Sequence, residues 1–155
     1  MVGIKILAQN RRARYDYEIL ETIEAGIALL GTEIKSMREG RGNISEAFAR
    51  FDNAELWLMN AHIAQYSAGG VNNHDPTRIR KLLLHKKQLI RLTRQIDQRG
   101  LTLIPLRLYI KRHRAKVELG LCRGRRQYDK RRSIIDRERE SEARAEMGRE
   151  RYQTN

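Results

Sequence analysis

The sequence has few of the residues that mark secreted, membrane-bound or disulfide-stabilised proteins. Cys122 is the only cysteine among 155 residues, which excludes an internal disulfide and fits a reducing compartment. No apolar run reaches the roughly 18 residues of a membrane-spanning helix, and no signal-peptide pattern is present. We therefore expect a soluble, cytoplasmic protein that is stabilised by an ordinary apolar core.

Sequence patterns for catalysis and cofactor binding are also missing. His62, His74, His85 and His113 show no metal-ligand spacing with Cys122 or with one another. The chain has no GxSxG, P-loop or GxGxxG motif. Cys122 lies in a predicted strand, where packing is its expected role. We expect no enzyme activity, no cofactor and no metal.

Acidic residues are scarce relative to basic ones. The chain has 32 Lys and Arg against 19 Asp and Glu, giving a formal net charge of +13 and a pI of about 10.5. A charge this large repels itself unless the partner is a polyanion, so nucleic acid or an anionic membrane surface is the first candidate. Arginine outnumbers lysine about three to one. This suits phosphate contacts and base stacking, although a GC-rich genome would produce the same bias.

The basic residues form clusters of one sign. Residues 78–94 contain seven cations and no acid, whereas an ordinary solvated helix mixes signs. The three clusters are Arg78, Arg80, Lys81, Lys86, Lys87, Arg91 and Arg94; Arg11, Arg12 and Arg14; and Arg123, Arg125 and Arg126. They predict phosphate binding through counterion release, with a merely soluble basic surface as the alternative. Because no helix-turn-helix or zinc-finger pattern is present, we favour structured RNA over DNA and expect no membrane partner.

Alternating apolar residues predict a mainly β protein. The expected strands cover about 15–30, 47–51, 55–59, 101–110 and 116–124, with a hairpin between the second and third and a further strand near 62–64. Gly26 should bend the first strand. The residues expected to share a strand face are Ile104, Leu106, Leu108 and Ile110 in one strand, and Val117, Leu119 and Leu121 in the next.

Two helices are expected beside these strands. Thr32 would cap a short helix over about 32–39. Asp75 would cap a longer helix that has Pro76 at its first position and ends at Gly100, although residues 78–85 could be extended instead. Without βαβ alternation, the economical fold is a small antiparallel OB-like barrel with flanking helices and a basic C-terminal tail.

Three regions follow from these patterns. Residues 1–9 are predicted to be a flexible N-terminal arm, 10–124 an OB-like RNA-binding domain, and 125–155 a basic tail. The tail has too few aliphatic residues to offset its ordering entropy, so we expect disorder when it is free and a helix on a partner. The alternative is a solvent-exposed tail without a role.

Several sequence motifs occur in an order typical of one known family. They are NRRARYDYEILETIEAGIALLGTEIKS, HDPTRIRKLLLHKKQL, GLTLIPLRLYI, KVELGL and GRRQYDKR. Together they cover nearly all of 10–138 and resemble the SsrA-binding proteins, or small protein B, of bacterial trans-translation. The resemblance implies an OB-like barrel, not an enzyme, that binds the tRNA-like domain of transfer-messenger RNA (tmRNA, SsrA RNA) and supports its alanylation by alanyl-tRNA synthetase. It also implies delivery of that RNA, with elongation factor Tu and GTP, to ribosomes stalled on messages without a stop codon.

The resemblance assigns RNA-binding roles to particular residues. Glu24 matches an RNA-binding glutamate, Leu83 an RNA-contacting leucine and Lys116 another RNA-binding position. The residues alone would suggest a strand-edge salt bridge for Glu24 and core packing for Leu83. The full predicted RNA-binding set is Asn10, Arg11, Arg12, Arg14, Glu24, Arg80, Lys81, Leu83, Lys116, Arg123, Arg125 and Arg126.

The tail motif has its own implied role. Tyr128, Asp129, Lys130 and Arg131 match residues that enter the empty messenger channel at the decoding centre of 16S rRNA, where Tyr128 could stack on a base. Arg139 stands where some members have a tryptophan, which puts an apolar anchor there in doubt. Two alternatives to this adaptor are a ribosomal protein or assembly factor that binds rRNA, and a basic DNA-compaction protein.

Overall fold

A computed structural model describes residues 3–124, and the predictions made for 125–155 lie outside these residues. The strands are β1 (Ile4–Gln9), β2 (Tyr17–Ile27), β3 (Gly42–Asn43), β4 (Phe48–Asp52), β5 (Glu55–Met59), β6 (His62–Ile63), β7 (Arg80–Leu83), β8 (Thr102–Lys111) and β9 (Arg114–Gly124). The helices are α1 (Ala13–Asp16), α2 (Gly31–Arg38) and α3 (Lys86–Arg99), with a 3-10 turn η1 at Gly70–Asn72.

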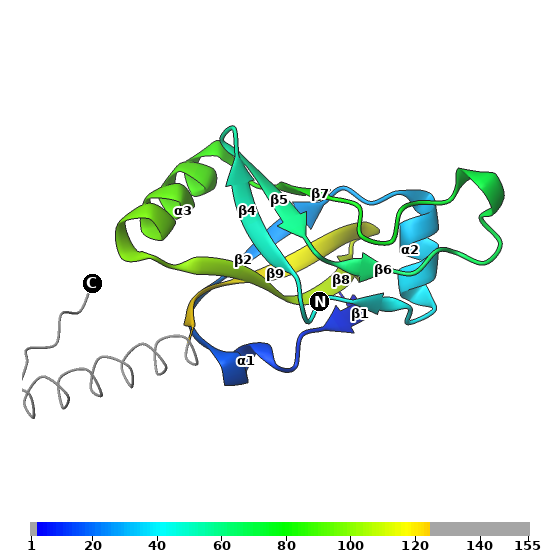
Figure 1. Ribbon diagram of the computed structural model, residues 1–155, viewed down its shortest axis with the longest axis horizontal. Helices are drawn as coiled ribbons and strands as arrows, with labels where there is room; N and C mark the ends of the chain where they lie inside the picture. The colour runs from blue at the N-terminus through cyan, green and yellow to red at the C-terminus, as the bar shows by residue number, and fades with distance from the viewer. Residues whose placement is uncertain (1–2, 125–155) are drawn as a thin grey trace, which may run out of the picture. The chain divides into compact units, whose positions relative to one another are not determined.

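The main sheet closes on itself into a barrel. Its order is β1-β8-β4-β5-β7-β2-β9, and an additional pairing between β8 and β9 closes the strands from β8 to β9 into a ring, with β1 added alongside β8. Residues 102–111 of β8 pair antiparallel with 114–122 of β9, and Ala49↔Leu103 links β4 to β8. Figure 1 shows α2 and α3 at opposite ends of this barrel. The predicted mainly β, OB-like barrel with flanking helices is confirmed.

The apolar core fills the barrel interior. Leu56, Leu103, Val117 and Leu119 are fully buried there, and Leu121 is nearly so. Two-residue periodicity explains this pattern, because alternate side chains of a strand point to the same side of the sheet. The predicted inward face of β9 is therefore confirmed.

A register shift in β8 divides the strand face that the sequence predicted to be continuous. The shift falls between Pro105 and Arg107. Ile104 and Leu106 consequently pack in a second, smaller cluster with Ala13 and Cys122, whereas Leu108 stays in the main core. Cys122 packs as predicted, and burial raises the pKa of its thiol to about 12.

The predicted flexible arm is a strand in the structure. β1 pairs antiparallel with β8 from Ile4↔Lys111 to Gln9↔Arg107, and Leu7 is buried in the main core. β8 is longer than the segment of β4 beside it, so an edge of β8 is left for β1 to pair with, which the sequence of residues 1–9 alone does not show. The flexible arm over 1–9 is therefore wrong for residues 4–9.

Two other predicted boundaries also differ from the structure. β2 begins at Tyr17, after the α1 turn, and runs through Gly26 without interruption. α2 begins at Gly31, where the Leu30 N–H donates to the Glu33 carboxylate at 2.7 Å. Thr32 is not the cap, because its hydroxyl is hydrogen-bonded to the ring of His74 instead.

The segment after Asp75 is extended, as the alternative prediction held. β7 pairs with β5 through Leu56↔Leu82 and with β2 through Gly26↔Leu83, and α3 starts only at Lys86. Gly100 ends α3 with φ of 62°, as predicted for a left-handed C-terminal glycine. None of the helices within residues 3–124 is long and apolar enough to cross a membrane.

Candidate nucleic-acid interface

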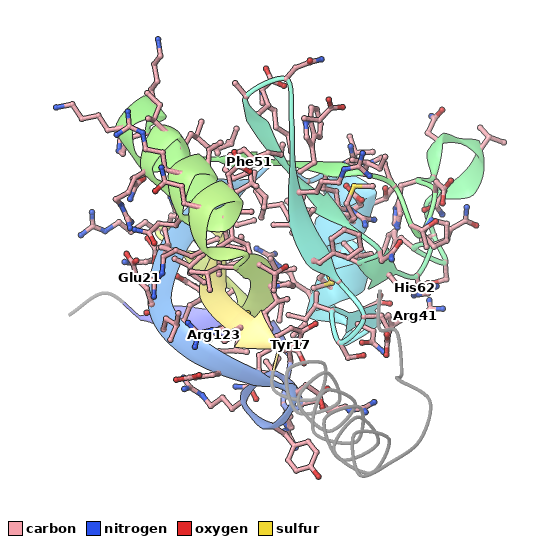
Figure 2. The ribbon with its side chains drawn as sticks, turned by 60° about the vertical axis from the view of Figure 1, so that its left-hand side comes forward. Tyr17, Glu21, Arg41, Phe51, His62 and Arg123 are labelled. Atoms are coloured by element: carbon pink, nitrogen blue, oxygen red, sulfur yellow. The ribbon has the colours of Figure 1, made fainter. Side chains whose placement is uncertain are left out.

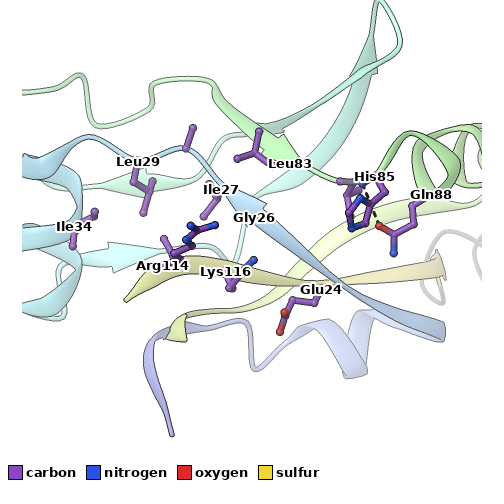
Figure 3. Close-up of a pocket in the computed structure, with 13 residues that line it drawn as sticks. Glu24, Gly26, Ile27, Leu29, Ile34, Leu83, His85, Gln88, Arg114 and Lys116 are labelled. Carbon is purple, nitrogen blue, oxygen red and sulfur yellow. Dashed lines mark hydrogen bonds between the residues drawn. The ribbon is translucent and has the colours of Figure 1, made fainter. Parts of the chain in front are cut away.

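An open groove of about 710 Å³ lies where β2, β7 and β9 meet the start of α3. Figure 3 shows Arg114 and Lys116 side by side on β9, with Leu83 on the far side of Gly26. A neighbouring hollow of about 480 Å³ shares Glu24, Arg114 and Lys116 with it. We call the two together the Leu83 groove.

Gly26 lets β7 approach β2 closely and holds Leu83 at the rim of the groove. The two residues are register partners, and a Cβ at Gly26 would lie 3.2 Å from the Cβ of Leu83. Leu83 is 51% exposed, so the alternative that it simply packs in the core is wrong. An exposed leucine beside cations can pack against a base or sugar.

Glu24 supplies a charged acceptor between these cations. Its carboxylate accepts a hydrogen bond from the Tyr109 hydroxyl and forms an ion pair with Lys111 Nζ at 3.3 Å. The Tyr109 hydrogen bond is the main cause that holds the pKa of Glu24 below its ordinary value. The predicted salt bridge is therefore present, yet the side chain is 40% exposed and remains an ionised acceptor at neutral pH.

The cations around Glu24 come from the turn between β8 and β9. Arg112 and His113 have φ of 51° and 63°, which makes a tight two-residue hairpin turn. The hairpin places Lys111, Arg112 and Arg114 beside Lys116 in the groove. The sequence KRHRA by itself predicts only a turn. The feature of the sequence that indicates a role in the groove is the density of cations at the end of a hairpin, where side chains from two strands converge.

Arg80 was predicted to bind RNA, and the structure contradicts this. Its side chain is fully buried and paired with Glu33 at 2.5 Å, and it also donates to the carbonyls of Ala61 and Pro76. Burial raises the pKa of Glu33, but hydrogen bonds from Arg78 and the Leu30 N–H and the charge of Arg80 outweigh it, so the pKa stays below its ordinary value. Arg80 faces inward because it alternates with outward-facing neighbours on β7.

Most of the basic cluster over 78–94 is neutralised by acids from elsewhere in the chain. Arg78 pairs with Glu33 at 2.6 Å, Lys81 with Glu55 at 3.4 Å and Arg91 with Glu21 at 2.8 Å. Figure 2 shows Glu21 on β2 beside α3. Within residues 3–124, Lys86, Lys87 and Arg94 have no acidic partner within 4.0 Å. The absence of acids from the basic cluster over 78–94 is thus a property of the local sequence and not of the folded surface.

The basic lead-in lies apart from the Leu83 groove. Asn10 is buried and its amide donates to the Pro105 carbonyl at 3.2 Å, while Arg12 pairs with Asp16 at 3.8 Å. Arg11 and Arg14 are exposed and Arg123 is partly exposed, but none of them lines the groove. Arg125, Arg126 and the tail motif at 128–131 lie outside the described residues.

The site has the chemistry of a binding surface. Residues 3–124 contain no group of three or more His, Cys, Asp or Glu that could hold a metal ion. The groove combines cations, one ionised carboxylate and one exposed leucine on a closed barrel. These features define the class as an OB-like RNA-binding protein.

Comparison with known proteins gives the family. The family model for SmpB protein matches residues 7–149, and the chain belongs to this family. It is 51% identical over 136 residues to the SsrA-binding protein of Desulfitobacterium hafniense (strain DSM 10664 / DCB-2), covering 88% of this chain and 87% of that one. It is 56% identical over 133 residues to the SsrA-binding protein of Levilactobacillus brevis, covering 86% and 85%.

A solved structure that contains SmpB also resembles this chain. A chain from "tmRNA-SmpB: a journey to the center of the bacterial ribosome" is 58% identical, has a TM-score of 0.63, and covers 75% of this chain and 82% of its own. The family predicted from the sequence motifs is confirmed.

Proposed function

We propose that this chain binds the tRNA-like domain of tmRNA through the Leu83 groove and delivers that RNA to stalled ribosomes in trans-translation. The relatives named as SsrA-binding proteins and the tmRNA–SmpB ribosome structure support this assignment. The observation that carries it is the groove itself. It brings together Glu24, Leu83 and Lys116, which the family resemblance singled out from separate parts of the sequence.

The groove residues divide the contacts with RNA. Lys116 and Arg114 attract phosphate oxygens, and their counterions are released on binding. Glu24 repels phosphate and therefore accepts from a base amino group or a ribose 2′-hydroxyl. Leu83 packs against a base or sugar. A folded RNA that exposes sugar and base edges beside its phosphates satisfies all three contacts.

The tail carries the second half of the proposal, from its sequence alone. Tyr128, Asp129, Lys130 and Arg131 occupy the empty messenger channel at the decoding centre, where cations meet 16S rRNA phosphates. Elongation factor Tu with GTP and alanyl-tRNA synthetase are indirect partners, which act through the tmRNA.

Two sets of variants test this division. Glu24→Gln with Lys116→Ala should weaken binding to the purified tRNA-like domain at least tenfold, since two direct contacts are lost. Replacing Asp129, Lys130 and Arg131 with alanine should leave that affinity within about twofold but abolish peptide tagging on stalled ribosomes. Equal loss of both activities in both sets would refute the division. Co-sedimentation with precursor subunits, and not with stalled 70S particles, would support an assembly factor instead.

A further inference from the structure

The outward side of β4, β5 and β7 carries a second surface, which shares no lining residue with the Leu83 groove. Arg50 pairs in register with Trp57, and Trp57 pairs with Lys81, so these three side chains form one row across the sheet. Alternation places Met59 and Ile79 on the same side. Figure 1 shows the three strands next to one another, with α2 and α3 beyond their ends.

This surface contains a hollow of about 480 Å³. It is lined by Arg50, Asp52, Trp57, Met59 and Ile79, and we call it the Trp57 hollow. Ile79 is 50% exposed, and Trp57 and Met59 are partly exposed. Trp57 is the only tryptophan of the chain. Trp, Met and Arg are the residue types enriched at protein interfaces, where a buried aromatic side chain often dominates the binding energy.

The charges around the hollow distinguish it from the Leu83 groove. Lys81 is neutralised by Glu55 at 3.4 Å. Arg50 and Asp52 stand at the hollow without an ion-pair partner in the part of the chain that the structure describes. The charges of Lys81, Glu55, Arg50 and Asp52 sum to zero in a chain of net charge +13. A phosphate therefore gains no net attraction at this surface. A protein segment that carries both signs is the better fit.

We infer that the Trp57 hollow docks a protein of the stalled-ribosome complex. One apolar side chain of the partner fills the space between Trp57 and Ile79, while an acid of the partner pairs with Arg50 and a base pairs with Asp52. The hollow of about 480 Å³ holds only a few side chains of a partner, so a short segment is enough to fill it. A second copy of this chain fits less well, because two chains of net charge +13 repel each other. The inference rests on the proposed function, because the partner is sought within the ribosome complex.

Site-directed crosslinking tests this assignment. A benzophenone can be attached at Ile79→Cys in the full chain, since the native Cys122 is buried and its thiol pKa is raised. The matched control carries the label at Val71→Cys, which is 99% exposed in the loop between β6 and β7. The labelled chains are assembled with tmRNA on purified stalled ribosomes and irradiated.

The expected product is an adduct at position 79 that survives nuclease, disappears with protease and is absent from the control. A nuclease-sensitive adduct, an adduct with a second copy of this chain, or no adduct above the control would overturn the inference. If the unlabelled chain does not bind the stalled ribosome together with tmRNA, the proposed function is refuted, and this inference is refuted with it because it rests on that function.

A charge substitution gives a second readout. Ile79→Asp places an acid in the hollow, and Val71→Asp makes the same charge change at the exposed loop. Both variants should bind the tRNA-like domain within twofold of the parent, whereas tagging should fall about tenfold only for Ile79→Asp. Unchanged tagging, or a loss of RNA affinity specific to Ile79→Asp, would contradict a protein-docking role.

Discussion

Arg80→Met tests whether Arg80 stabilises the fold through its buried ion pair or contacts RNA. Methionine keeps much of the side-chain volume but removes the charge that faces Glu33 and the donors to Ala61 and Pro76. Removing one partner of a buried pair costs about 3–5 kcal/mol, because the other charge is left uncompensated. Glu33 keeps its bond from Arg78 at 2.6 Å, so we expect the lower end, about 3 kcal/mol.

The assay is thermal unfolding followed by circular dichroism, beside titration with the tRNA-like RNA. For a domain of this size, 1 kcal/mol corresponds to roughly 3–4 °C, so Tm should fall by about 10 °C. RNA affinity measured well below that Tm should stay within about twofold. An unchanged Tm with a tenfold loss of affinity would refute the burial argument and restore Arg80 as an RNA contact.

A double-mutant cycle with Glu33→Gln checks the pair itself. The double variant should lose at least 1 kcal/mol less free energy of unfolding than the two single variants lose in sum. The reason is that Glu33→Gln removes the charge that Arg80→Met leaves unpaired. The pKa of Glu33 is lowered in the folded state, so its contribution to stability is present above the unfolded-state pKa and is lost as pH falls through the folded one. The acid-induced fall in stability should therefore be smaller in Glu33→Gln than in the parent.

Three further changes test the groove and the barrel. Tyr109→Phe removes the main hydrogen bond that lowers the pKa of Glu24, so Glu24 should take up its proton at a higher pH. When RNA affinity is measured from about pH 7 down to pH 4, the loss of affinity should therefore begin at a higher pH in the variant than in the parent. An unshifted profile would mean that ionised Glu24 does not contact RNA. Gly26→Ala pushes against Leu83 at 3.2 Å and should reduce RNA affinity several-fold by filter binding, with a stability cost of about 1–3 kcal/mol. Leu7→Ala should cost about 2 kcal/mol or more in urea unfolding, whereas no loss would indicate a flexible arm.

Much of the barrel follows from local patterns in the sequence. The inward residues of β9, the β4–β5 hairpin and the glycine that ends α3 each depend on a few neighbouring residues. The pairing of β1 with β8 joins residues about a hundred positions apart, which no local window contains. The register shift at Pro105 depends on how β8 pairs with Leu119 and Glu118 of β9, and the alternation within β8 alone does not show it.

The candidate site shows the same limit. The cluster over 78–94 looked purely basic because its acids, Glu21, Glu33 and Glu55, come from other strands and from α2. Glu24, Leu83 and Lys116 were selected by resemblance, and no property of their local sequence would bring them together. Arg112 and Arg114 were missed because only the folded hairpin shows that they reach the same groove.

The pairing of β1 with β8 sets a delay during synthesis of the protein. The first strand leaves the ribosome about a hundred residues before its partner does, which at roughly 5–20 residues per second is about 5–20 s. Throughout that interval the nascent chain presents Ile4, Ile6 and Leu7 with no strand to receive them. Any product released before Thr102 would keep an open sheet edge, and such fragments should be aggregation-prone substrates for cellular proteases.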